Sequence, residues 1–70
     1  MKLRQAEEGK EYIIRELNID DEELRAFLFS LGCYSGERIT VISHRRSGCT
    51  VSIKDARYSI DVPLSEAIVV

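Results

Sequence analysis

The stretch from Asp20 to Gly32 (DDEELRAFLFSLG) constrains the fold most, because it carries both a start and a stop signal for one helix. Its apolar residues follow the i, i+3, i+4, i+7 spacing of one helical face: Leu24, Phe27, Leu28 and Leu31. Asp20 is the expected N-cap, and Glu23 three residues later completes a capping-box pattern. We therefore predict an amphipathic helix that packs this stripe against a core.

The segment after the helix contains a cysteine and a tyrosine between two glycines. Gly32 lies one residue beyond the stripe, where a residue in the left-handed conformation commonly ends a helix. Cys33 follows at a position where an apolar side chain folds back on the last turn, and a buried thiol serves there as a small hydrophobe. Gly36 provides a second turn. We interpret the segment as a bend in the chain and not as a redox or metal site.

The rest of the chain alternates apolar and polar residues with a period of two, which is typical of strands. One strand is predicted before the helix, over 11–17, with Tyr12 and Ile14 on the same face. Four strands are predicted after it, at 38–43, 49–54, 58–62 and 67–70, the first three joined by polar turns at 44–48 and 54–57. Pro63 cannot donate to a ladder, so it opens a short turn or a single helical turn before the last strand.

Five short strands with one helix inserted between the first and the second predict a mainly β fold in one domain, residues 1–70. A small barrel, closed or nearly closed, suits this order of elements. Closure hides strand edges that would otherwise pair between molecules. We expect the apolar stripe of the helix to cover one open end or one flank of the barrel.

Charge and composition narrow the range of functions. The formal net charge is −2 with 31% charged residues, so no basic surface argues for a nucleic-acid partner. The N-terminus lacks the pattern of a signal peptide, and no apolar run approaches the roughly 20 residues that span a bilayer. These features predict a cytoplasmic protein without direct membrane insertion, its two cysteines remaining thiols. The initial methionine suggests a complete protein, and nothing in the sequence indicates its oligomeric state.

Three motifs together resemble the ferrous iron transport protein A (FeoA) family. They are LRAFLFSLGCYSG, then ERITVI, then YSIDVPLSEAIVV. The positions that carry the resemblance are Leu3, Gly9 and Ile14 near the start, Leu31, Gly32 and Gly36 in the centre, and Ala67, Ile68 and Val70 at the end. The chain departs from the family pattern at Cys33, Tyr34 and Ser35 and in the segment HRRSGC, which affects the surface more than the core.

The resemblance implies an SH3-like barrel and a role as a small cytosolic accessory protein of bacterial ferrous iron uptake. It implies a partner too, namely the large membrane GTPase that transports the iron (FeoB-type). A similar barrel occurs as the C-terminal domain of metal-dependent repressors, where it makes protein contacts.

The residues give little reason to expect a cofactor or an enzyme. His44, Cys49 and Cys33 are the only imidazole and thiol groups, and their spacing does not match a four-ligand closed site. The alternative function is an iron carrier or metal sensor that uses His44 and Cys49, which flank a predicted hairpin turn. No Ser-His-Asp pattern is visible, and the sequence does not place the single histidine near Cys33 as a general base. No phosphate-binding loop of the G-x-x-x-x-G-K-S/T type is present.

Partner binding is the remaining possibility, and four residues are candidates for it: Phe29, Tyr34, Arg45 and Arg46. Phe29 lies about 140° from the centre of the leucine stripe at about 100° per residue, so we expect it outside the core. Tyr34 follows in the bend, and an exposed aromatic pair is a suitable anchor for a partner. The alternative is that Phe29 packs near Leu3. Arg45 and Arg46 form a basic hairpin tip that either meets an acidic partner or only keeps the hairpin soluble.

Overall fold

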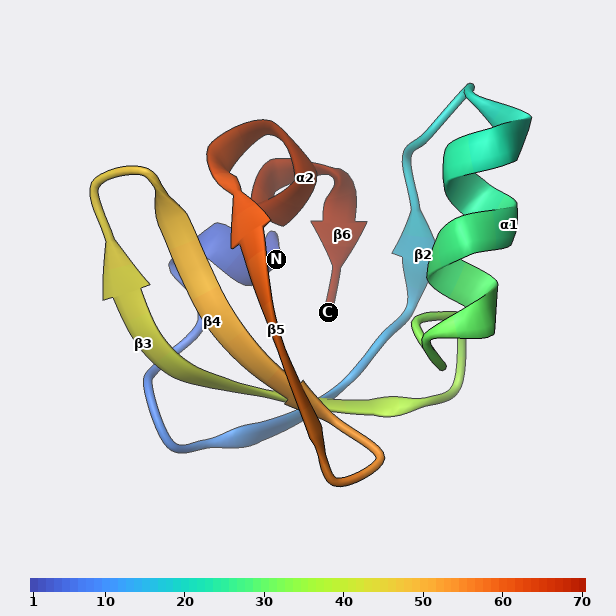
Figure 1. Cartoon of the computed structure of the whole chain (residues 1–70). Helices are drawn as coiled ribbons and strands as arrows, with labels where there is room; N and C mark the ends of the chain where they lie inside the picture. The colour runs from blue at the N-terminus through green and yellow to red at the C-terminus, as the bar shows by residue number, and fades with distance from the viewer.

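The computed structural model describes all 70 residues, and its strands form two antiparallel sheets (Figure 1). The larger sheet has the order β1-β3-β4-β5, and the smaller one pairs β2 with β6. The bounds are β1 Glu11–Ile13, β2 Glu16–Leu17, β3 Arg38–Arg45, β4 Gly48–Ile53, β5 Ala56–Asp61 and β6 Ile68–Val69. The helices are a 3₁₀ helix at Leu3–Gln5, α1 at Glu22–Ser30 and α2 at Val62–Ala67.

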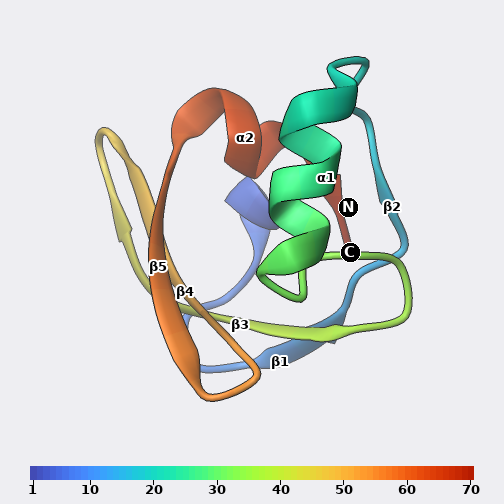
Figure 2. The same cartoon turned by 45° about the vertical axis from the view of Figure 1, so that its right-hand side comes forward.

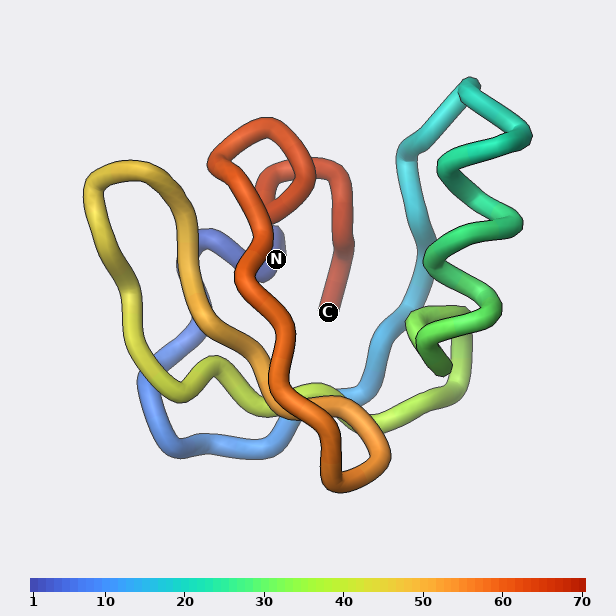
Figure 3. The backbone as a smooth tube through the Cα atoms, in the orientation of Figure 1, coloured from blue at the N-terminus to red at the C-terminus, as the bar shows by residue number.

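The core lies between the two sheets and consists of twelve buried apolar residues from most elements of the chain. They are Leu3, Ala6, Ile14, Leu28, Cys33, Ile39, Val41, Cys49, Val51, Ile53, Ile68 and Val70. The alternation predicted for β3 and β4 is observed, since Ile39, Val41, Cys49, Val51 and Ile53 are buried. In β5, half-buried residues alternate with exposed ones. The two ends of the chain lie together (Figure 3), with the Val70 N–H donating to the Met1 carbonyl oxygen at 2.8 Å.

The single strand predicted at 11–17 is wrong, because the chain changes sheets within it. β1 pairs with β3, whereas β2 pairs with β6. Where the chain passes from one sheet to the other, the Ile14 N–H donates to the Glu37 carbonyl oxygen and the Ile14 carbonyl oxygen accepts from the Gly36 N–H. The next residue, Arg15, donates its backbone N–H to the Val69 carbonyl oxygen. The six strands therefore replace the five that alternation predicted. α1 follows β2 along the chain; it lies at one side of the molecule in Figure 1 and comes to the front in Figure 2.

The start of α1 also differs from the prediction by one residue. Asp21, and not Asp20, is the N-cap, and its Oδ1 accepts from the N–H groups of Glu23 and Leu24 at 2.9 and 3.2 Å. This shift removes the predicted capping box, because the third helical position is then Leu24 and not Glu23. Two adjacent aspartates offer equivalent caps in the sequence, so local pattern alone did not decide between them.

The apolar face of α1 is narrower than predicted. Leu28 is buried, and Leu24 and Leu31 pack against the core, but Phe27 is 57% exposed and its prediction as a core residue is wrong. Phe27 lies roughly 60° to one side of the three leucines at about 100° per residue. At that angle the Phe27 side chain points away from the core and is left in solvent.

The end of α1 forms the predicted left-handed stop. Gly32 has φ of +92°, its N–H donates to the Phe29 carbonyl oxygen at 3.0 Å, and the Cys33 N–H donates to the Leu28 carbonyl oxygen at 2.9 Å. This pair of bonds is the Schellman motif, and the side chain that follows it is the buried Cys33. The bend after the helix therefore has the structural role that the sequence indicated.

Substituting Gly32 tests the importance of this bend. In Gly32→Ala the new Cβ would lie 2.9 Å from Lys54 Cδ and 3.3 Å from Ile53 Cγ2, in addition to the strain of a positive φ. We expect a loss of about 2–4 kcal/mol in the free energy of unfolding, measured by urea denaturation. Gly36→Ala is the matched control, since Gly36 has φ of +95° but no atom lies within 4 Å of the position that its Cβ would take. Equal losses in the two variants would show that the contact with Lys54 is unimportant.

Candidate partner-binding groove

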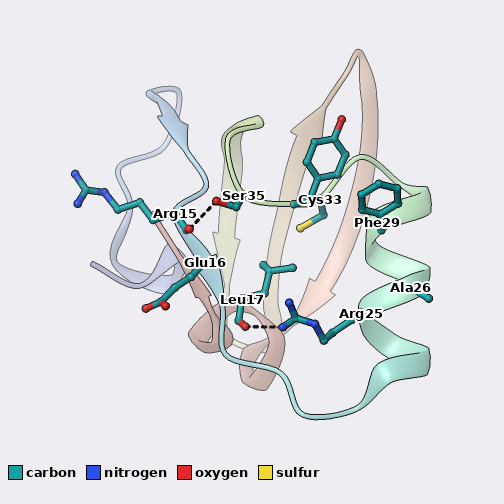
Figure 4. A pocket seen from close by; sticks show the side chains of 9 residues that line it. Arg15, Glu16, Leu17, Arg25, Ala26, Phe29, Cys33 and Ser35 are labelled. Carbon is teal, nitrogen blue, oxygen red and sulfur yellow. Dashed lines mark hydrogen bonds between the residues drawn. The ribbon is translucent and has the colours of Figure 1, made fainter.

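A groove with a volume of about 490 Å³ opens between α1, β2 and the segment after the helix (Figure 4). It is lined by Arg15, Glu16, Leu17, Arg25, Ala26, Phe29, Cys33, Tyr34 and Ser35. Apolar and aromatic side chains form part of the lining, and three charged residues belong to it as well. This combination of an apolar lining with charged groups is common in sites that bind another molecule.

The two aromatic candidates, Phe29 and Tyr34, meet at this groove. Phe29 is 65% exposed, as expected from its place outside the leucine stripe, and it does not enter the core. Its ring centroid lies 4.9 Å from that of Tyr34, with the planes tilted by 35°. The Gly32–Cys33 bend brings the two rings together, because it turns the chain back beside the last turn of α1. Aromatic pairs at this separation attract one another beyond their shared burial.

Tyr34 is supported from behind by Lys54. Lys54 Nζ lies 5.6 Å from the Tyr34 ring centroid and 3.1 Å from Glu37 Oε2. Lys54 and Asp55 form the two-residue turn between β4 and β5, and both have positive φ, 49° and 67°. A left-handed conformation at two consecutive non-glycine residues is unfavourable in isolation. The ion pair with Glu37 orients the Lys54 ammonium toward the tyrosine ring.

The charges of this cluster shift two pKa values. The Arg38 backbone N–H and the Lys54 ammonium lower the pKa of Glu37, with a further contribution from the Tyr34 hydroxyl. The Glu37 carboxylate and the Tyr34 hydroxyl raise the pKa of Lys54. Both shifts favour the charged forms, so the pair is intact around neutral pH.

The groove is further defined by side chains that bond to the backbone. Arg25 Nη1, from α1, donates to the carbonyl oxygens of Leu17 and Ile19 at 2.9 and 3.2 Å. Ser35 Oγ donates to the Arg15 carbonyl oxygen at 2.8 Å. These bonds hold α1 and the bend to the segment around β2. Figure 4 shows two of them, from Arg25 to Leu17 and from Ser35 to Arg15.

Sequence reasoning missed β2 and Arg25 as parts of this site. The alternation of residues 11–17 predicts one long strand, so it does not reveal that Leu17 belongs to a separate strand. Arg25 belongs to no recognisable binding motif in the sequence. Its contact with Leu17 depends on the path of the loop between β2 and α1, for which the sequence gives no periodic signal.

The two basic candidates lie elsewhere. Arg45 ends β3 and Arg46 occupies the turn to β4, at the opposite side of the molecule from α1 (Figure 1). The Arg45 guanidinium is engaged, donating to the hydroxyls of Thr50 and Ser59 on the neighbouring strands. Arg46 is exposed. The predicted basic tip therefore exists but is separate from the aromatic groove.

His44 and Cys49 are cross-strand partners in the β3–β4 hairpin, which places them on one face. The His44 Nε2 donates to the Ala6 carbonyl oxygen at 2.7 Å, and its backbone N–H donates to Glu8 Oε2 at the same distance. Cys49 is buried, and burial raises the pKa of its thiol although Arg4 and Arg45 oppose this. No three His, Cys, Asp or Glu side chains in the structure are grouped as a metal site. The carrier alternative therefore depends on these two residues alone.

A family model described as the FeoA domain matches residues 1–70. This chain belongs to the FeoA domain family. Two solved FeoA-family structures are similar to it. Iron(II) transport protein A from Clostridium thermocellum has a TM-score of 0.86 and 21% identity, over 99% of this chain and 43% of that one. FeoA from Chlorobium tepidum has a TM-score of 0.88 and 18% identity, over 99% and 67%.

Two further comparisons extend the likeness. FeoA of Stenotrophomonas maltophilia, complexed with zinc and described as a prokaryotic SH3 domain protein, has a TM-score of 0.83 and 14% identity over 99% of this chain and 87% of that one. A manganese-dependent transcriptional repressor has a TM-score of 0.84 and 21% identity over 97% and 39%. At these identities the likeness shows the fold, which is SH3-like. This FeoA-family chain spans less than half the length of the Clostridium protein. A comparison with curated protein sequences gives no match.

No helix of the chain combines the length and the apolar character that crossing a bilayer demands.

The thiol at the groove offers one test of this geometry. Burial raises the pKa of Cys33 to about 11. At pH 8 the thiolate fraction should be roughly a hundredfold below that of an ordinary cysteine. We expect both cysteines to react slowly with an aromatic disulfide reagent in the native protein and rapidly in urea. Rapid reaction of one thiol under native conditions would contradict the buried position of Cys33 or Cys49.

The Glu37–Lys54 pair predicts a pH dependence. Because the pKa of Glu37 is lower in the folded state than its ordinary value of 4.5, the unfolded chain takes up this proton first as the pH falls. The stabilisation by this carboxylate is therefore present at neutral pH and disappears below pH 4.5. We expect Glu37→Gln to be less stable than the natural protein at pH 7 and the difference to shrink in acid. A difference independent of pH would mean that the charge of Glu37 is unimportant.

Proposed function

We propose that this protein is a non-enzymatic cytoplasmic accessory protein of ferrous iron uptake, and that it binds the cytosolic part of a FeoB-type membrane GTPase transporter. In this proposal the groove between α1 and β2 receives the transporter, and binding modulates its GTPase activity or its assembly. Phe29 and Tyr34 act as the anchors of the contact.

Membership in the FeoA domain family over the whole chain supports the iron-transport role. Two similar structures are named for iron: the Clostridium protein as an iron(II) transport protein and another FeoA as an iron uptake regulatory protein. The groove itself favours binding over catalysis, since its lining contains no paired nucleophile and base.

The single observation that carries the proposal is the exposed Phe29 packed against Tyr34 at the groove. A phenylalanine that is 65% exposed contributes little to the core, yet this one is held in position by a neighbouring ring. Rigid aromatic side chains lose little conformational entropy on binding and commonly supply most of an interface's energy.

The charged groups of the groove add selectivity. Arg15 and Glu16 are exposed on the β2 side, whereas Arg25 is held by the backbone oxygens it contacts. Exposed charges around an apolar anchor influence the rate of encounter and exclude mismatched partners more than they strengthen the final complex. The transporter surface that fits here would present an apolar side chain flanked by polar groups of both signs.

Removing the anchor tests the proposal. Phe29→Ala should weaken binding to the purified cytosolic domain of the transporter by about 2 kcal/mol, roughly 30-fold, as measured by calorimetry with and without GTP. Phe27→Ala is the matched control, because Phe27 is a similarly exposed phenylalanine on the same helix but does not line the groove. It should leave the affinity nearly unchanged.

The outcomes separate the parts of the proposal. Equal effects of the two alanine variants would reject the groove as the contact. No binding of the natural protein under any nucleotide and iron(II) condition would reject the transporter as the partner. Arg46→Glu tests the hairpin tip separately, and a loss confined to that variant would move the contact to the β3–β4 turn.

A further inference from the structure

The free edge of β5 carries hydrogen-bonding groups that have no partner within the chain. β5 ends the larger sheet and pairs only with β4. The two-residue turn at Lys54–Asp55 makes Ile53 and Ala56 a hydrogen-bonded pair, so alternate residues of β5 bond to β4. The backbone groups of Arg57 and Ser59 therefore point away from β4, and no hydrogen bond between them and another segment is formed.

The side chains on this edge carry opposite charges without ion-pair partners. Arg57, Ser59 and Asp61 alternate on the outer face of β5 and are exposed. Neither Arg57 nor Asp61 takes part in a salt bridge, although one carboxylate oxygen of Asp61 accepts from the Leu64 N–H at the start of α2. Edge strands commonly use charges to discourage pairing. Here the strand carries one basic and one acidic side chain, so two antiparallel copies of it can place Arg57 of each beside Asp61 of the other.

We propose that β5 pairs with β5 of a second copy of this chain, antiparallel, with the two Ser59 residues facing each other on the two-fold axis. Free backbone groups lie at odd-numbered residues, so only odd residues can form hydrogen-bonded pairs across the edge. Centring the pair on Ser59 allows all three odd residues of β5, namely Arg57, Ser59 and Asp61, to form such pairs. This register places Arg57 of each copy opposite Asp61 of the other, and Tyr58 opposite Ile60 on the inner face.

The backbone bonds of such a dimer can be enumerated. Each Ser59 N–H donates to the carbonyl oxygen of the other Ser59, and each Asp61 N–H donates to the carbonyl oxygen of the other Arg57. The Asp61 carbonyl is less available because Asp61 is the N-cap of α2. One strand pair buries less than the ~1,000 Å² that a stable interface needs, so the dimer is weak and depends on concentration. A symmetric pair of this kind closes after two copies.

Charge reversal tests the register. Arg57→Glu places acidic side chains opposite each other at both ends of the strand pair, and we expect roughly a tenfold or greater rise in the dimer dissociation constant by sedimentation equilibrium. Arg46→Glu is the control with the same net charge, on an exposed turn away from β5, and it should dimerise like the natural protein. Equal behaviour of the two variants, or a monomeric natural protein up to millimolar concentration, would overturn the proposal.

Crosslinking tests the position of the axis. Opposed Ser59 residues would have Cα atoms about 5.5 Å apart, within the range of a disulfide. Ser59→Cys should therefore oxidise to a covalent dimer much faster than Ser47→Cys, which makes the same change at an exposed hairpin turn. Similar rates would overturn the proposal. The result is independent of the proposed transporter partner, because no residue of β5 lines the groove.

Discussion

The close approach between Gly32 and the Lys54 side chain joins three parts of the working surface that are distant in the sequence. It brings the end of α1 against the β4–β5 turn, two segments far apart in the sequence. Beyond Gly32, the Lys54 ammonium forms an ion pair with Glu37 and lies beside the Tyr34 ring. A methyl group at Gly32 would push the Lys54 methylenes aside, and this would weaken the contact of the Lys54 ammonium with the Tyr34 ring that packs against Phe29. One residue without a Cβ thus links the helix end, the hairpin turn and the groove.

The elements that the sequence predicted well are those whose signals are local. The left-handed stop at Gly32, the buried Cys33 and the exposure of Phe29 follow from neighbouring residues and helical geometry. The split of 11–17 into two strands could not be predicted in this way, because both halves alternate correctly and the change of partner occurs through distant contacts of Ile14. The groove was missed for the same reason, since Arg25 reaches it only through the fold.

The residues that looked most like metal ligands contribute mainly to the structure. His44 joins β3 to the N-terminal segment through both its ring and its backbone, while Cys49 fills the core opposite it. A thiol whose pKa is raised by burial is a poor ligand, because metals bind the thiolate. Since Nε2 donates to a carbonyl oxygen, it carries the proton, and only the buried Nδ1 of His44 is without a hydrogen-bond partner. The contacts give both residues a structural role, and the iron-carrier alternative stays a prediction.

The groove and the β5 edge are formed by different residues, and this separation has a consequence for binding. The groove is lined by residues of α1, β2 and the bend, whereas the proposed edge is formed by β5 of the other sheet. Pairing through β5 would use no residue that lines the groove. A dimer would then present two grooves, and two weak contacts to an assembled transporter would reinforce one another because the second binding event becomes intramolecular. A domain of 70 residues with a small interface would gain affinity in this way without any larger contact surface.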